Sequence, residues 1–155
     1  MLAQLAVAAA KAALVVLTFA QAEQRGLGAT TLSATYADAA DGPDSALAAA
    51  PCKLLAARLA STYAPKHVAD ASAAGASVFM RIYIDSVGNA RYALFAPMCS
   101  VDGRQLSAQA QRQLAGVLRQ AVAKVPFATL AKPYFCHLSF AMGKRAHGPR
   151  QKLPT

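Results

Sequence analysis

A strict alternation of apolar residues in positions 77–85 constrains this chain more than any other feature. The apolar residues stand at every second position: Val78, Met80, Ile82 and Ile84. This spacing puts them all on one face of a β-strand, which can then pack on a core. Residues 86–89 contain Gly and Asn, which tolerate the positive φ of a tight turn. A second alternation over residues 90–95 then predicts an antiparallel hairpin. Asp85 and Gly88 are assigned to its turn.

Two helices and a third strand complete the predicted domain. A helix begins at Pro51, which suits a first helical turn, and ends before Pro65. A second helix over residues 107–124 has apolar residues at steps of three and four. Residues 134–142 alternate again. The order helix–strand–strand–helix–strand predicts an α+β fold over residues 51–142. We expect a three-stranded antiparallel sheet with the helices packed on one face and at least one sheet edge open.

The N-terminal segment has the features of a targeting signal. Lys11 precedes a charge-free apolar run over residues 12–20, and Ala20-Gln21-Ala22 is a small-x-small cleavage pattern. Residues 1–22 are therefore predicted to be a cleaved signal peptide, with the product in the periplasm or secreted. An uncleaved anchor in the inner membrane, facing the periplasm, and an organelle transit peptide remain alternatives. Residues 23–50 are interpreted as a flexible, Ala-rich leader.

The three cysteines, Cys52, Cys99 and Cys136, have no metal-type spacing, because none lies within four residues of another. In an oxidising compartment two of them could form a disulfide. Cys99 and Cys136 flank the second predicted helix and are the expected pair. Reduced, buried cysteines are the alternative.

The net charge of +9 arises entirely after Asp102, where nine basic residues follow without an acid. Residues 143–155 are predicted to be a basic disordered tail. Arg112, Arg119, Lys144 and Arg145 define the predicted basic surface. This surface is either simply solvated or a contact for an acidic partner or an anionic lipid surface.

Residues 63–142 resemble the C-terminal domain of TonB-type energy transducers. The matching positions run in chain order: Tyr63-Ala64-Pro65, Gly75, Ile84-Asp85 with Gly88, a helix after Leu106, Phe127 and Pro133, and a last strand with Leu138 and Phe140. Two features depart from the family. Residues 23–50 hold a single proline where full transducers have a long Pro-rich spacer, and the chain has no tryptophan.

The resemblance implies a periplasmic domain that binds an outer-membrane transporter or another envelope protein. In that family a short segment of the transporter adds as a strand to the open sheet edge, where unpaired backbone groups supply affinity. The last strand is the expected edge, with Tyr134, Cys136, His137, Leu138, Ser139 and Phe140 as the binding residues. A homodimer through the same edge and membrane association through the N-terminus are further expectations.

Enzymatic chemistry is not expected. The sequence has no Gly-rich phosphate loop and no Gly-x-Ser-x-Gly elbow, and its three histidines are scattered. We therefore expect a non-enzyme with no cofactor and no metal. The alternative function is nucleic-acid binding by the basic helix and tail. It is less favoured because the N-terminus indicates export.

Overall fold

The hairpin expected from the alternation forms the middle of the sheet. The computed structural model describes residues 14–63, 76–97 and 106–141. Strands β3 (Ser77–Ile84) and β4 (Ala90–Pro97) pair antiparallel, with a register irregularity next to the turn. Strand β5 (Tyr134–Ala141) lies antiparallel on the other side of β3. These three strands are the ones predicted from the sequence.

Two further strands extend this sheet at its edges. Strand β1 (Val15–Thr18) pairs parallel with β4, and the two-residue β2 (Ala37–Asp38) pairs parallel with β5. The strand order is β1-β4-β3-β5-β2. The α+β class is confirmed, whereas a purely antiparallel sheet of three strands was wrong because the N-terminal residues add parallel strands on both sides.

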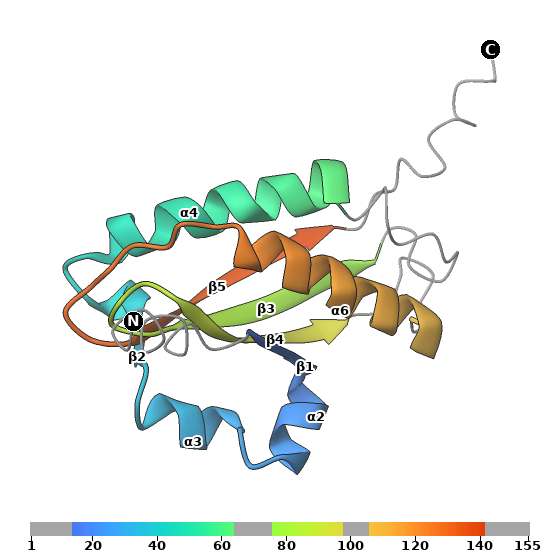
Figure 1. Cartoon of the computed structure of the whole chain (residues 1–155), viewed down its shortest axis with the longest axis horizontal. Coiled ribbons are helices and arrows are strands. Elements are labelled where there is room, and N and C mark those ends of the chain that lie inside the picture. Colours follow the sequence, from blue (N-terminus) through green and yellow to red (C-terminus); the bar gives the residue numbers. More distant parts are fainter. Residues whose placement is uncertain (1–13, 64–75, 98–105, 142–155) are drawn as a thin grey trace, which may run out of the picture.

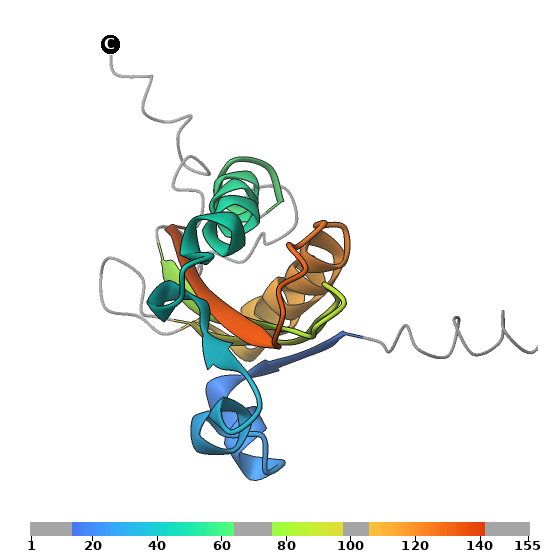
Figure 2. The same ribbon diagram turned by 90° about the vertical axis from the view of Figure 1, so that its left-hand side faces the viewer.

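The two predicted helices cover one face of the sheet (Figures 1 and 2). Helix α4 (Ser45–Arg58) continues into a π-helical turn, η2 (Leu59–Tyr63), and helix α6 spans Ala108–Ala123. The N-cap of α6 is Ser107, whose hydroxyl accepts a hydrogen bond from the Ala110 N–H at 3.0 Å. Helix α4 begins six residues before the predicted start at Pro51, so this proline lies inside the helix.

The expected flexible leader is folded in this structure. It contributes to helices α2 (Phe19–Gln24) and α3 (Ala29–Ser33), to β2 and to the short helix η1 (Ala39–Asp41). Its buried residues, Leu32, Tyr36, Ala39 and Ala48, explain why. Helices α2 and α3 lie below the sheet in Figure 1, opposite α4 and α6. The sheet therefore has helices on both faces rather than one.

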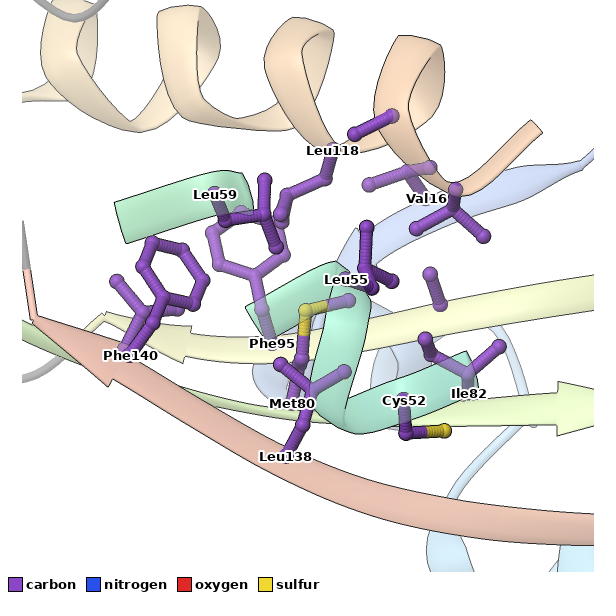
Figure 3. Packing of buried hydrophobic residues seen from close by; sticks show 14 of the residues in the cluster. Val16, Cys52, Leu55, Leu59, Met80, Ile82, Phe95, Leu118, Leu138 and Phe140 are labelled. Carbon is purple, nitrogen blue, oxygen red and sulfur yellow. The ribbon is translucent and has the colours of Figure 1, made fainter. Parts of the chain in front are cut away.

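The main core fills the space between the sheet and helices α4 and α6. Figure 3 shows Leu55 of α4, Leu59 of η2 and Leu118 of α6 packed over side chains from the strands. All four alternating residues of β3 are fully buried there: Val78, Met80, Ile82 and Ile84. A smaller cluster on the opposite face joins Tyr83, Leu94 and Phe135 to residues of the N-terminal segment.

Strand β1, at one edge of the sheet, contributes buried side chains to both apolar clusters. Val16 is 5% exposed and belongs to the main core, and Leu17 is 6% exposed and belongs to the smaller cluster. Burial of side chains this size contributes roughly 1.5–3 kcal/mol each. β1 therefore consists of residues that the sequence predicted to be part of a removable signal. The other predicted signal residues up to position 13 lie outside the described residues.

Replacing Leu55 by Ala should test the packing of α4 on the sheet. Leu55 is 2% exposed, so the loss of its buried methyl groups should lower the free energy of unfolding by about 2–5 kcal/mol in urea denaturation. The matched control is Leu54→Ala on the same helix, because Leu54 is 55% exposed and its loss should change the free energy by less than about 0.5 kcal/mol. Equal effects of the two substitutions would contradict this packing.

Candidate functional site

The outer edge of β5 is covered over only part of its length. Strand β5 pairs with β3 from Tyr134 to Ala141, whereas β2 pairs only with Tyr134 and Phe135. From Cys136 onward, no strand among the described residues pairs with the outer side of β5. The predicted edge strand is therefore an interior strand at its start and an open edge over the rest of its length.

The backbone groups that face this open edge can be identified from one hydrogen bond. The Ala37 N–H donates to the Pro133 carbonyl at 3.1 Å, and Ala37 pairs with Tyr134. In a parallel pair a residue bonds to the two residues that flank its partner, and the backbone groups of successive residues point to opposite edges. The N–H and C=O groups of His137, Ser139 and Ala141 therefore point away from β3, toward the open side.

A groove runs beside this edge. It has a volume of about 550 Å³ and lies between α4, η1 and β5. Four residues of β5 line it: Cys136, His137, Leu138 and Ser139. The opposite wall consists mainly of alanines, with Lys53 among them, and Asp38 lies at the β2 end. Because the alanine wall has short side chains, an extended backbone could approach β5 closely here.

Cys136 joins the edge strand covalently to helix α4. It forms a disulfide with Cys52, 84 residues earlier in the chain, and both cysteines line the groove. The expected pairing with Cys99 was therefore wrong, because α4 packs over β5 and brings Cys52 to Cys136. Cys99 itself lies outside the described residues. The bond holds together the two walls of the groove.

Loss of this disulfide should destabilise the domain. The disulfide closes a long loop and so lowers the conformational entropy of the unfolded chain. The double substitution Cys52→Ala and Cys136→Ala should therefore lower the free energy of unfolding by about 2–5 kcal/mol. Peptide mapping of the wild-type protein under non-reducing conditions should find Cys52 linked to Cys136 and a free thiol at Cys99. A Cys99–Cys136 peptide would contradict the arrangement.

His137 lies in an aromatic cluster on the face of the sheet opposite α4 and α6. Its ring stacks on Phe79, with the centroids 5.6 Å apart, and lies 5.3 Å from the ring of Phe135. The Arg81 guanidinium lies 5.2 Å from the Phe135 centroid and 5.9 Å from that of Phe19. These cation–π contacts tie β3, β5 and α2 together. His137 and Ser139 are exposed, as the alternation predicted.

Tyr134 fixes the start of β5. The side chain is 2% exposed, and its hydroxyl donates a hydrogen bond of 2.6 Å to the Ala128 carbonyl. Burial raises the pKa of the Tyr134 phenol above its ordinary value of 10.0, because the ionised form would lose its hydration. Tyr134 is thus an anchor of the strand rather than an accessible binding residue.

The raised pKa of Tyr134 predicts a loss of stability at high pH. At pH values well below 10 the phenol is protonated in both the folded and the unfolded state. As the pH rises above 10, the unfolded chain releases this proton more readily, so the free energy of unfolding falls. Tyr134→Phe should reduce that fall between about pH 9 and about pH 11, while costing about 1 kcal/mol at neutral pH through the lost hydrogen bond. Urea denaturation across this range measures both effects, and an unchanged slope would contradict the pKa assignment.

Asp85 and Gly88 form the hairpin turn as expected. One Asp85 carboxylate oxygen accepts hydrogen bonds from the N–H groups of Val87 at 3.1 Å and Asn89 at 2.9 Å. The other lies 3.8 Å from the Arg91 guanidinium. Gly88 has a φ of +87°, and a Cβ there would lie 2.8 Å from the Thr129 hydroxyl. Both residues therefore have structural roles.

The predicted basic surface is placed only in part. Arg112 and Arg119 are exposed on α6, whereas Lys144 and Arg145 lie outside the described residues. Lys53 and Arg58 are exposed on α4, and neither helix contains an acidic residue. The charged residues within these two helices are thus all positive.

The sequence missed the residues that complete the site around β5. Cys52, Lys53 and the alanines of α4 form the groove wall, and β2 decides where the open edge begins. The cysteines were the one sequence feature that could have indicated contact between α4 and β5, but the spacing of three cysteines does not reveal which two are bonded.

Across residues 14–63, 76–97 and 106–141, no three His, Cys, Asp or Glu side chains come together as metal ligands. No helix in these ranges is both long and apolar enough to span a bilayer.

Comparisons with known protein families, with curated proteins and with solved structures found no match to this chain.

Proposed function

We propose that this chain is an exported interaction domain of the TonB C-terminal kind. It binds an extended segment of an envelope protein, such as an outer-membrane transporter, by strand addition to the outer edge of β5. The observation that carries this proposal is the edge itself: outward backbone groups at His137, Ser139 and Ala141, beyond the short cover given by β2. Unpaired groups in a row are a template for another strand.

The groove supports an extended ligand rather than a compact one. A strand added beside β5 would point alternate side chains toward α4 and toward the opposite face. On the α4 side the alanine wall leaves about 550 Å³, room for small or medium apolar side chains. On the other side the ligand would meet the exposed His137 and Ser139. Backbone pairing would supply affinity, and the groove would select side chains.

Two features support export. A disulfide between Cys52 and Cys136 suits an oxidising compartment, because cytosolic thiols are kept reduced. The N-terminal residues carry the Lys11, apolar-run and Ala20-Gln21-Ala22 pattern of a secretory signal. The core order of helix, strand, strand, helix and strand is also the order expected from the TonB resemblance.

Nucleic-acid binding is the second candidate, and one observation favours it. The exposed faces of α4 and α6 carry Lys53, Arg58, Arg112 and Arg119 without an acid, which suits phosphates. The aromatic side chains on the second face of β3 offer no exposed platform for base stacking. Tyr83 is only 1% exposed, and Phe79 packs against Phe19 of α2. Strand addition therefore remains the preferred function.

Ser139→Pro should abolish partner binding without unfolding the domain. Ser139 is exposed, and its N–H points to the open side, so proline removes a donor for the added strand and leaves the ladder to β3 intact. A proline at Leu138 would instead break the ladder to β3 in the core. We expect Ser139→Pro to eliminate binding to the periplasmic N-terminal segments of outer-membrane transporters in titration calorimetry.

The matched control is Ser139→Ala, which keeps the N–H group and should bind as wild type does. Amide hydrogen exchange gives a second measurement, because an added strand should protect the amides of His137 and Ser139. Full binding by a stably folded Ser139→Pro protein would refute strand addition at this edge. Retardation of a short DNA duplex that Arg112→Glu with Arg119→Glu removes would favour the second candidate.

A further inference from the structure

Residues 15–18 belong to two structures that cannot exist together. In the sequence they form part of the apolar run before the predicted cleavage point at Ala22. In the folded chain they are β1, the edge strand that pairs with β4 from Tyr92 to Phe95. Cleavage after Ala22 would remove β1 and most of α2 from the molecule.

Such a cut has to precede folding. Ala22 is fully buried, and it lies inside α2, whose N-terminus is fixed by a capping box between Thr18 and Gln21. A peptidase needs an accessible, extended chain at the bond it cleaves, and the folded protein does not present one here. A chain processed during export would therefore fold without β1.

The processed domain would have an incomplete edge at β4. The direction of the backbone N–H and C=O groups, which alternates along β5, also fixes the direction in β3 and then in β4, because the residue pairs between these strands are known. In β4 the N–H and C=O groups of Ala93 and Phe95 therefore point toward the position that β1 occupies. Removal of β1 also leaves two apolar sites empty: that of Val16 in the main core and that of Leu17 in the opposite cluster.

The position that β1 would leave empty sets requirements on the segment that can fill it. Because successive residues of β1 are buried on opposite faces, its occupant must be apolar on both faces rather than alternating. It must also run parallel to β4, as β1 does. Arg112 lines a groove of about 280 Å³ near the end of β1, beside Thr18 and Gln21, so the C-terminal end of an occupant would meet a cation.

We infer that the edge of β4 is a second binding site in the processed protein. Its ligand is an extended segment of another envelope protein, with about four consecutive apolar residues, which takes the place of β1. This inference rests on the export in the proposed function and goes beyond it, because it uses the opposite edge of the sheet. The sequence of β1, Val-Val-Leu-Thr, is the template for the ligand.

The test begins with the full chain exported by a bacterium with two membranes. Mass spectrometry of the purified protein should find an N-terminus after Thr18. An N-terminus before Val15 would overturn the inference while leaving the proposal for β5 intact. The matched control is Ala20→Glu, which removes one small residue of the cleavage pattern at an exposed position of α2 and should keep β1 in place.

The processed protein is then titrated with a fluorescent peptide of residues 14–19, flanked by lysines for solubility. We expect saturable binding and a higher melting temperature, with binding at least about tenfold weaker for the peptide with Val16→Lys. The uncleaved Ala20→Glu protein should not bind, because its own β1 occupies the site. Ser139→Pro should bind the peptide as wild type does, which separates this site from the edge of β5.

Two further results would also overturn the inference. The first is a processed protein that is stable and does not bind the peptide. The second is a processed protein that forms a dimer which the peptide does not dissociate, because a second copy of the chain would then occupy the edge of β4.

Discussion

The central position of β3, buried under two helices on one face and paired along both edges, is the constraint on which the rest of the structure depends. Its even-numbered side chains are fully buried under α4 and α6, and Tyr83 on the opposite face is 1% exposed. Its backbone pairs with β4 on one side and β5 on the other. Every other element is placed by reference to this strand, because a one-residue change in its register would turn its fully buried face away from α4 and α6.

The sequence predicted the elements whose pattern is local. The alternation in β3, β4 and β5 and the apolar stripe of α6 are visible in short windows, and all four elements were found. Strands β1 and β2 were missed for a physical reason. Val15–Thr18 is a short continuous apolar run that resembles a signal sequence, and Ala37–Asp38 is too short for any period. Both are strands only because distant residues pair with them.

Of the candidate site, only the strand β5 itself could be predicted from the sequence. The sequence indicated which side chains of β5 face the core, and Cys136, Leu138 and Phe140 are buried as expected. It did not indicate that β2 covers Tyr134 and Phe135, nor that α4 forms a groove beside Ser139. These features depend on tertiary contacts between segments that are distant in the sequence, and a local residue pattern does not indicate such contacts. The assignment of Cys136 to Cys99 failed for the same reason.

The bond between Cys52 and Cys136 also imposes an order of events on the newly made chain. One sulfur belongs to a helix that is translated early, and the other to the last strand of the described structure. The correct pair therefore cannot form until almost all of the polypeptide has been synthesised and has emerged from the ribosome. Until then Cys52 can meet only Cys99, the one other thiol. Release of the C-terminal strand, rather than synthesis of the helix, sets the moment at which the domain becomes covalently closed.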